Sequence, residues 1–258
     1  MNNKRLTDLE SHITITLNGE SREIVPFFFI ETEEDGVISV PNPEYTAFIT
    51  LEKYKIRLQK YSKIPKDYWN LEFDNYKGNL STASKDNAVA YTENFDTPKF
   101  EAVNLYLFGN HSCQKTMIAC NIGKGLLKKG YDVKFVYASE LIDLLMKSQG
   151  YGTLPEVEEE IKKYHEADLL IIDDIFDFEK STYWEKSSHI IIGCWDKFLR
   201  RRISENKRIV VTSNYSVSAL EEKFGVSIFN LIKRNFYELT FYDNVNDVCQ
   251  SKFANLFD

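Results

Sequence analysis

A glycine between an apolar run and a Lys-Thr pair is the feature that most constrains the fold of this 258-residue chain. The run Leu105–Phe108 ends at Gly109, and Lys115 and Thr116 begin an amphipathic, helix-like segment. In a strand–loop–helix turn, the backbone N–H groups and the helix N-terminus present partial positive charge to a phosphate. Lys115 would reach the terminal phosphates, and the Thr116 hydroxyl would ligate Mg²⁺. The stretch therefore predicts a phosphate-binding loop.

The match to the G-x-x-x-x-G-K-T pattern is incomplete, because Gln114 occupies the position of the second glycine. Two alternatives follow. Either Gln114 adopts a left-handed backbone conformation at a cost on the order of 1–2 kcal/mol, or the loop is rearranged so that its amide contacts phosphate. The first is favoured, because Lys115 and Thr116 keep their register relative to Gly109. Taken alone, the motif is equally compatible with a strand-to-helix turn that binds no ligand and has Lys115 and Thr116 on the surface. The predicted nucleotide-binding residues are Gly109, Asn110, His111, Ser112, Cys113, Gln114, Lys115 and Thr116.

Two adjacent carboxylates end a second apolar run, Leu169–Ile172. Asp173 is predicted to hold Mg²⁺ through water or Thr116, and Asp174 to orient or deprotonate an attacking water. A solvated turn in which Asp174 caps the next helix is the structural alternative. The spacing from Lys115 suits two intervening α/β units, so the motifs are expected to meet at the carboxyl ends of neighbouring parallel strands.

A third apolar run, Ile209–Thr212, leads to Asn214, which is the candidate for a sensor between the attacking water and the terminal phosphate. Ahead of it, Lys197–Ile203 contains three successive arginines at a helix end. These can complement the helix dipole or reach a phosphate of a neighbouring subunit. A solvated charged face is the structural alternative for this run.

The alternation of apolar runs with helix-length amphipathic segments predicts an α/β fold with a parallel sheet covered on both faces. Residues 1–70 are expected to form a small β-containing module that ends in a helix and a linker, and 71–258 the main domain. The N-terminal helix is expected at Leu51–Tyr61. The expected strands of the main domain are Leu105–Phe108, Val133–Tyr137, Leu169–Ile172, Ile209–Thr212 and Glu238–Phe241, and the expected helices are Lys115–Lys129, Ser139–Met146, Val157–His165 and Ser187–Ile203.

Composition narrows the class of protein. A formal net charge of −7 argues against a chain whose whole surface binds nucleic acid, although a local basic stripe is compatible with it. No segment approaches the roughly 20 apolar residues of a membrane span, so a cytoplasmic location without membrane contact is expected. The four cysteines form no C-x-x-C pair and are interpreted as reduced thiols.

Taken in order, these motifs resemble the bacterial replicative helicase loaders of the DnaC and DnaI type and the related transposition ATPase IstB. The resemblance covers roughly residues 58–240. Tyr61–Tyr68 with Leu71–Tyr76 is similar to the family's segment ahead of the ATPase core, and Leu126–Phe135 to its passage from helix to second strand. The family's arginine-then-sensor spacing favours Arg202 among the three arginines.

The resemblance implies an AAA+ P-loop NTPase core with a parallel sheet flanked by helices, plus a small N-terminal module. It implies ATP and Mg²⁺ as cofactors, with Asp174, Asn214 and Arg202 as catalytic residues. The family's paired arginines are not at the expected place, which leaves Lys233 and Arg234 as displaced candidates for contact across a subunit interface. Expected partners are a hexameric replicative helicase, single-stranded DNA and further copies of the ATPase core.

Several alternatives remain open. A degenerate AAA+ scaffold with little or no hydrolysis is supported by Gln114, and a transposition helper shares the same core motifs. A metabolic P-loop kinase is a weaker alternative, because the sensor-like strand and the arginine-bearing helix would have no required role in such an enzyme. The first 57 residues carry no recognisable loader appendage and lack the cysteines of the zinc-bearing version, so a divergent loader carried by a phage or mobile element would fit. The candidates for contact with DNA phosphates are Lys124, Lys128, Lys129 and Lys134. A solvent-exposed helix face would explain these lysines equally well.

Overall fold

The structure is a computed structural model, and it describes residues 13–17, 19–24, 28–33, 36–149, 154–176 and 184–242. The chain divides into two compact units, Met1–Arg57 and Leu58–Asp258. This division precedes the junction expected near residue 70, because the intervening segment contacts the second unit. Phe135 N donates to Ser62 O at 2.7 Å, and Lys124 Nζ donates to Trp69 O at 3.3 Å.

In the first unit, two antiparallel hairpins precede a helix. Strand β1 (Ile13–Leu17) pairs with β2 (Glu20–Ile24), and β3 (Phe28–Glu33) pairs with β4 (Gly36–Pro41). The two hairpins form separate two-stranded sheets, which agrees with the alternating apolar pattern of this region.

Helix α1 (Pro43–Ile56) starts earlier than the expected Leu51. The Asn42 side chain accepts hydrogen bonds from the backbone N–H groups of Glu44 and Tyr45, and proline occupies the first helical position. Both features stabilise a helix N-terminus. The sequence Pro41-Asn42-Pro43 therefore forms the start of α1. A π-helical segment, Arg57–Tyr61, follows α1 along the chain and ends at the expected Tyr61.

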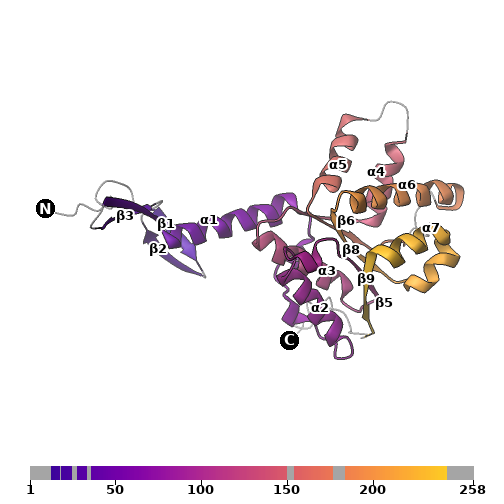
Figure 1. The fold of residues 1–258 in the computed structure, drawn as a ribbon, viewed down its shortest axis with the longest axis horizontal. Coiled ribbons are helices and arrows are strands. Elements are labelled where there is room, and N and C mark those ends of the chain that lie inside the picture. The colour runs from indigo at the N-terminus through magenta and orange to yellow at the C-terminus, as the bar shows by residue number, and fades with distance from the viewer. Residues whose placement is uncertain are drawn as a thin grey trace, which may run out of the picture. The chain divides into compact units, whose positions relative to one another are not determined.

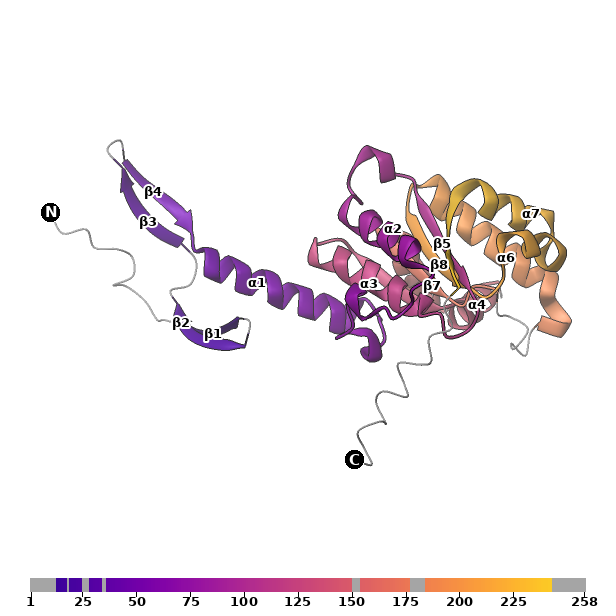
Figure 2. The same cartoon turned by 90° about the horizontal axis from the view of Figure 1, so that it is seen from below.

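The second unit contains a five-stranded parallel sheet in the order β6-β7-β8-β5-β9. Figures 1 and 2 show helices on both faces of this sheet, as the sequence predicted. Apolar side chains of the three central strands, β5, β7 and β8, are almost wholly buried, as parallel strands covered on both faces require. The strands are β5 (Asn104–Gly109), β6 (Val133–Tyr137), β7 (Leu169–Asp173), β8 (Arg208–Ser213) and β9 (Phe236–Phe241).

Helices α2 and α3 lie on one face, and α6 and α7 lie on the other (Figure 2). Helix α4 packs against α6, and α5 packs against α4. Most residues of α3 are buried, since it crosses the sheet beneath α2. The helices are α2 (Thr82–Glu93), α3 (Lys115–Lys128), α4 (Ala138–Lys147), α5 (Pro155–Glu166), α6 (Trp184–Ser204) and α7 (Leu220–Asn235).

Two of these helices, α2 and α7, were not expected from the sequence. Serine, asparagine and aspartate make the sequence of α2 resemble a linker, but the helix packs against α3. The approach is close, since a Cβ on Gly125 of α3 would lie 2.4 Å from Thr92 Cγ2. Tertiary packing thus overrides the weak local propensity of this segment.

The described residues contain no helix long and apolar enough to cross a membrane.

Candidate nucleotide-binding site

The phosphate-loop sequence joins the end of β5 to the start of α3, as predicted. Gly109 is the last residue of β5 and lies opposite Phe241 of β9. A Cβ on Gly109 would lie 2.3 Å from the Phe241 carbonyl oxygen, a backbone atom fixed within the sheet. Glycine is therefore required here by the close approach of a neighbouring strand.

Gly109→Ala is expected to lower the free energy of unfolding by about 1–3 kcal/mol, because strand β9 would have to move. Thermal or urea unfolding measures the change. Gly193→Ala in α6 is the matched control, since a Cβ there meets no atom within 4 Å and alanine favours a helix. Equal stability of the Gly109 variant and the wild type would contradict the steric argument.

Gln114 has the left-handed backbone conformation that the first of the two alternatives requires, with φ 59° and ψ 22°. Ser112 also has a positive φ, 62°. Neither alternative predicted the contact that the Gln114 side chain makes. Its Oε1 accepts a hydrogen bond from the backbone N–H of Lys77 at 2.9 Å. The carboxamide is thus bound to the segment that precedes α2.

Lys115 connects the loop to the sensor strand. Its Nζ donates to Gly109 O at 2.8 Å, Asn110 O at 2.7 Å and Asn214 Oδ1 at 3.0 Å. The side chain is buried, and this burial lowers the pKa of the ammonium from its ordinary value, against the opposing effect of nearby acidic groups. The structure therefore brings together Lys115 and Asn214, which were predicted to act on the same terminal phosphate.

Asp173 lies at the buried end of β7. Its Oδ1 accepts hydrogen bonds from Thr116 Oγ1 at 2.9 Å and Thr212 Oγ1 at 2.7 Å. Burial raises the pKa of Asp173 to about 6, and the neighbouring Asp174 carboxylate adds to this, while the two hydroxyl donors oppose it. A bound divalent cation would favour the ionised carboxylate.

The Asp173–Thr116 pair suits a Mg²⁺ ion. Thr116 Oγ1 and Asp173 Oδ1 lie 2.9 Å apart. A hydroxyl and a carboxylate oxygen are the kinds of protein ligand that would hold Mg²⁺ at a phosphate loop. No group of three or more His, Cys, Asp or Glu side chains in the described part of the chain could hold a metal. With a nucleotide bound, phosphate oxygens and water would supply the remaining Mg²⁺ ligands.

Asp174 is exposed and follows the strand directly. Its backbone N–H donates to Thr212 Oγ1 at 2.9 Å, and its φ of 54° is left-handed. Thr212 therefore orients both carboxylate residues, a role that the sequence reasoning did not assign. The signal was present as a polar residue at the end of an otherwise apolar strand.

The expectation that the loop and the acidic pair follow neighbouring strands was wrong. Strand β8 lies between β5 and β7. The motifs still meet, because α3 crosses the sheet and presents Thr116 to β7, while β8 contributes Thr212 and leads to Asn214 between them.

Arg202 lies elsewhere, and this is at odds with the role expected for it. The side chain is wholly buried, and burial lowers the pKa of its guanidinium to about 10. It donates to the carbonyl oxygens of Tyr164 and His165 at the end of α5, Ala167 before β7 and Arg208 in β8. These bonds satisfy helix-end and strand carbonyls, so the guanidinium is not available to a phosphate of another subunit.

The other arginine candidates are exposed. Arg201 has a side-chain exposure of 61% and pairs with Glu205 at 3.1 Å. Arg200 pairs with Asp196 at 2.7 Å. Lys233 and Arg234 are exposed at the end of α7.

The lysines proposed for DNA contact are engaged within the chain. Lys124 is wholly buried and donates to the carbonyl oxygens of Trp69 and Leu71, so its proposed DNA contact is not supported. Lys134 is nearly buried. Ion pairs join Lys134 to Asp132 at 2.9 Å, Lys128 to Glu72 at 3.3 Å and Lys129 to Asp96 at 3.8 Å.

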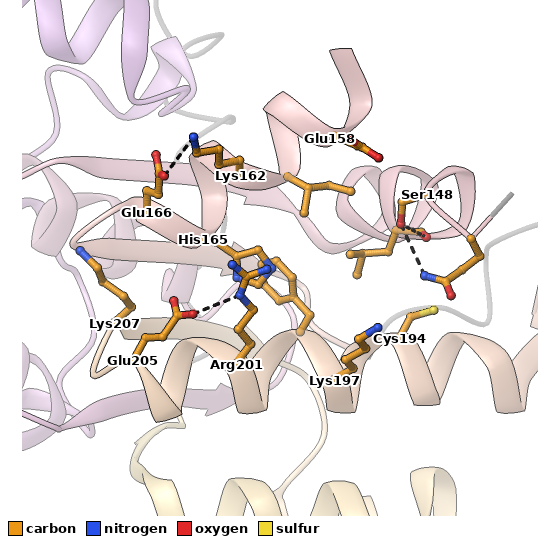
Figure 3. A pocket seen from close by; sticks show the side chains of 14 residues that line it. Ser148, Glu158, Lys162, His165, Glu166, Cys194, Lys197, Arg201, Glu205 and Lys207 are labelled. Carbon is orange, nitrogen blue, oxygen red and sulfur yellow. Dashed lines mark hydrogen bonds and ion pairs between the residues drawn. The ribbon is translucent and has the colours of Figure 1, made fainter. Parts of the chain in front are cut away.

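A cavity of about 600 Å³ lies between α4, α5 and α6 (Figure 3). Its apolar lining includes Phe198, against which the His165 ring packs with a centroid separation of 4.4 Å. Burial lowers the pKa of His165 to about 4, with a contribution from Arg201 and Arg202, so the ring is neutral at pH 7. No predicted nucleotide-binding residue lines this cavity, and the candidate site therefore rests on the loop geometry.

Comparison with solved structures shows the AAA+ P-loop fold. The crystal structure of the DnaC helicase loader superposes with a TM-score of 0.57 at 22% identity, covering 69% of this chain and 99% of the loader chain. The DnaI crystal structure gives 0.54 at 21% identity, covering 70% and 95%. DnaA bound to AMPPCP and single-stranded DNA gives 0.53 at 15% identity, covering 70% and 51%.

Curated relatives include a replication initiator and a replicative helicase loader. The chain is 29% identical to the chromosomal replication initiator protein DnaA of Lactobacillus helveticus over 198 residues, which are 74% of this chain and 40% of DnaA. It is 30% identical to the replicative helicase loader DnaI of Bacillus subtilis over 123 residues, which are 48% of this chain and 37% of DnaI. The matches thus span about two-fifths of the length of these relatives.

The family model of the IstB-like ATP binding proteins matches residues 96–229, which include the phosphate loop, the acidic strand end and the sensor strand. The match covers more than half of the chain, and the chain therefore belongs to the family of IstB-like ATP binding proteins.

Proposed function

We propose that this protein is an ATP-dependent helicase loader that binds ATP and Mg²⁺ and delivers a hexameric replicative helicase to single-stranded DNA. The observation that carries the proposal is the convergence of three strand ends on one site. Lys115 contacts Asn214 at 3.0 Å, and Thr116 contacts Asp173 at 2.9 Å. The similarity to DnaC, DnaI and DnaA supports the replication role.

The proposed chemistry divides among residues of this site. Backbone N–H groups of the loop and the N-terminus of α3 bind the phosphates, with Lys115 on the terminal ones. Thr116 and Asp173 hold Mg²⁺, which would neutralise charge on the phosphates when bound. Asp174 accepts a proton from the attacking water, and Asn214 orients that water against the terminal phosphate.

Asp174→Asn is expected to preserve ATP affinity and to lower ATP turnover by about 100-fold or more, because the amide binds water but does not take its proton. A binding titration with a labelled ATP analogue and a phosphate-release assay measure the two quantities. Asp143→Asn in α4 serves as the matched control, since it removes the same charge outside the site. Turnover that survives in the Asp174 variant would contradict the assignment.

Self-assembly would place a cation from one subunit at the nucleotide of the next. We propose Arg201 for this role, in place of the buried Arg202, because its guanidinium is exposed at the end of α6. Arg234 at the end of α7 is the second candidate. A stabilising cation supplied in trans makes hydrolysis depend on protein concentration.

The client is tested by co-migration of the purified protein with the replicative helicase of its own host. Residues 1–70 are proposed to bind this helicase, and the ATPase core to bind single-stranded DNA. Co-migration with ATP and its loss in the Lys115→Ala variant are the expected results. A stable complex with a transposase in place of the helicase would favour the transposition helper.

A scaffold that binds nucleotide with little or no hydrolysis is the second candidate, and Gln114 in its left-handed conformation favours it. Phosphate release measured with and without single-stranded DNA distinguishes the two functions. A loader is expected to turn over ATP in at least one of these conditions, whereas a scaffold would bind ATP without turnover in either.

A further inference from the structure

The residue that departs from the phosphate-loop pattern contacts a distant part of the chain. Gln114 is left-handed, with φ 59°, where glycine is the favoured residue. Its Oε1 accepts a hydrogen bond from the Lys77 backbone N–H at 2.9 Å. Its Nε2 is buried and has no hydrogen-bond partner among the described residues, so Oε1 alone holds the carboxamide. A glycine at this position would lack the contact.

Lys77 ends a stretch that we call the pre-loop segment, residues 66–77. The buried Nζ of Lys124 in α3 donates to the carbonyl oxygens of Trp69 and Leu71 in this segment. Near the C-terminal end of the segment, next to Lys77, the Tyr76 ring meets the Phe241 ring edge-on, with centroids 5.9 Å apart. The contact from Gln114 adds a direct attachment to the phosphate loop.

We propose that Gln114 is a positioning residue that couples nucleotide binding at the phosphate loop to the placement of the pre-loop segment. The inference rests on the proposed nucleotide-binding function of the loop. Gln114 is adjacent to Lys115, so an adjustment of the loop around phosphate moves the carboxamide that holds Lys77. By linkage, the factor by which nucleotide stabilises the Lys77 contact equals the factor by which this contact raises nucleotide affinity.

The contact itself is tested without nucleotide by hydrogen exchange of the Lys77 amide. Gln114→Asn keeps the carboxamide and tolerates the left-handed conformation, but it is one methylene too short to reach Lys77. Exchange of the Lys77 amide is expected to be about 3- to 10-fold faster in this variant, as for the loss of one typical hydrogen bond. Gln114→Glu keeps the length and the acceptor oxygen and should retain slow exchange. Equal exchange in the wild type and Gln114→Asn would overturn the proposal.

The coupling is tested by repeating the measurement with Mg²⁺ and AMPPCP, a non-hydrolysable ATP analogue. In the wild type, AMPPCP is expected to slow the exchange of the Lys77 amide, because nucleotide stabilises its contact with Gln114. In Gln114→Asn, this slowing should be lost. The Tyr242 amide, bound by Ser81 Oγ at 2.8 Å, serves as an internal control that should be equal in both proteins. An identical response of Lys77 in both proteins would overturn the coupling.

A wild type that does not bind AMPPCP would overturn the nucleotide-binding function and the coupling with it. The nucleotide-free comparison of Gln114→Asn with Gln114→Glu would still decide whether the Gln114 side chain holds the pre-loop segment.

Discussion

Lys115→Ala is expected to lower ATP affinity by at least about 100-fold, which corresponds to roughly 3 kcal/mol. The ammonium is held within the loop by Gly109 O, Asn110 O and Asn214 Oδ1, close to the position predicted for the terminal phosphates. Charge-assisted hydrogen bonds to phosphate are among the strongest that a side chain makes, and alanine removes them. Titration with a fluorescent ATP analogue measures the loss.

The matched control is Lys128→Ala, which removes the same charge from the other end of α3. Lys128 is half exposed and pairs with Glu72 at 3.3 Å, away from the loop. Its affinity for ATP is expected to remain within about twofold of the wild type, since an exposed ion pair contributes little. Thermal unfolding of both variants shows whether the domain remains folded. Equal ATP affinity of the Lys115 and Lys128 variants would refute the phosphate-loop assignment.

Arg202→Met is expected to lower the free energy of unfolding by about 3–5 kcal/mol. The substitution keeps much of the buried volume but leaves the four carbonyl oxygens that the guanidinium binds without this donor. For a domain of this size, the melting temperature should fall by roughly 6–20 °C. Differential scanning calorimetry of the full chain measures the change.

The neighbouring Arg201→Ala variant separates stability from assembly. Its side chain is 61% exposed, so its loss should change the stability by less than about 1 kcal/mol. If Arg201 acts at the nucleotide of a neighbouring subunit, the variant should lose the concentration-dependent part of ATP turnover while its melting temperature is retained. A melting temperature that falls equally in both variants would contradict the structural role assigned to Arg202.

Sequence patterns by themselves determined the parallel α/β core and the strand-to-helix position of the phosphate loop. Both are local properties: apolar runs indicate buried strands, and a glycine followed by a Lys-Thr pair marks a turn of known chemistry. For the same reason, Asp173 and Asn214 were placed correctly at strand ends. The polar sequence of α2 carried no comparable local signal, and its packing on α3 decided that it is a helix.

Tertiary structure alone decided which distant residues meet. The strand order places β8 between β5 and β7, so Thr212 shares Asp173 with Thr116. Spacing along the chain does not encode this order. Burial likewise distinguishes Arg202 from Arg201, although both belong to one run of arginines, because successive helix positions point in different directions and only one of them meets the carbonyl groups at the end of α5.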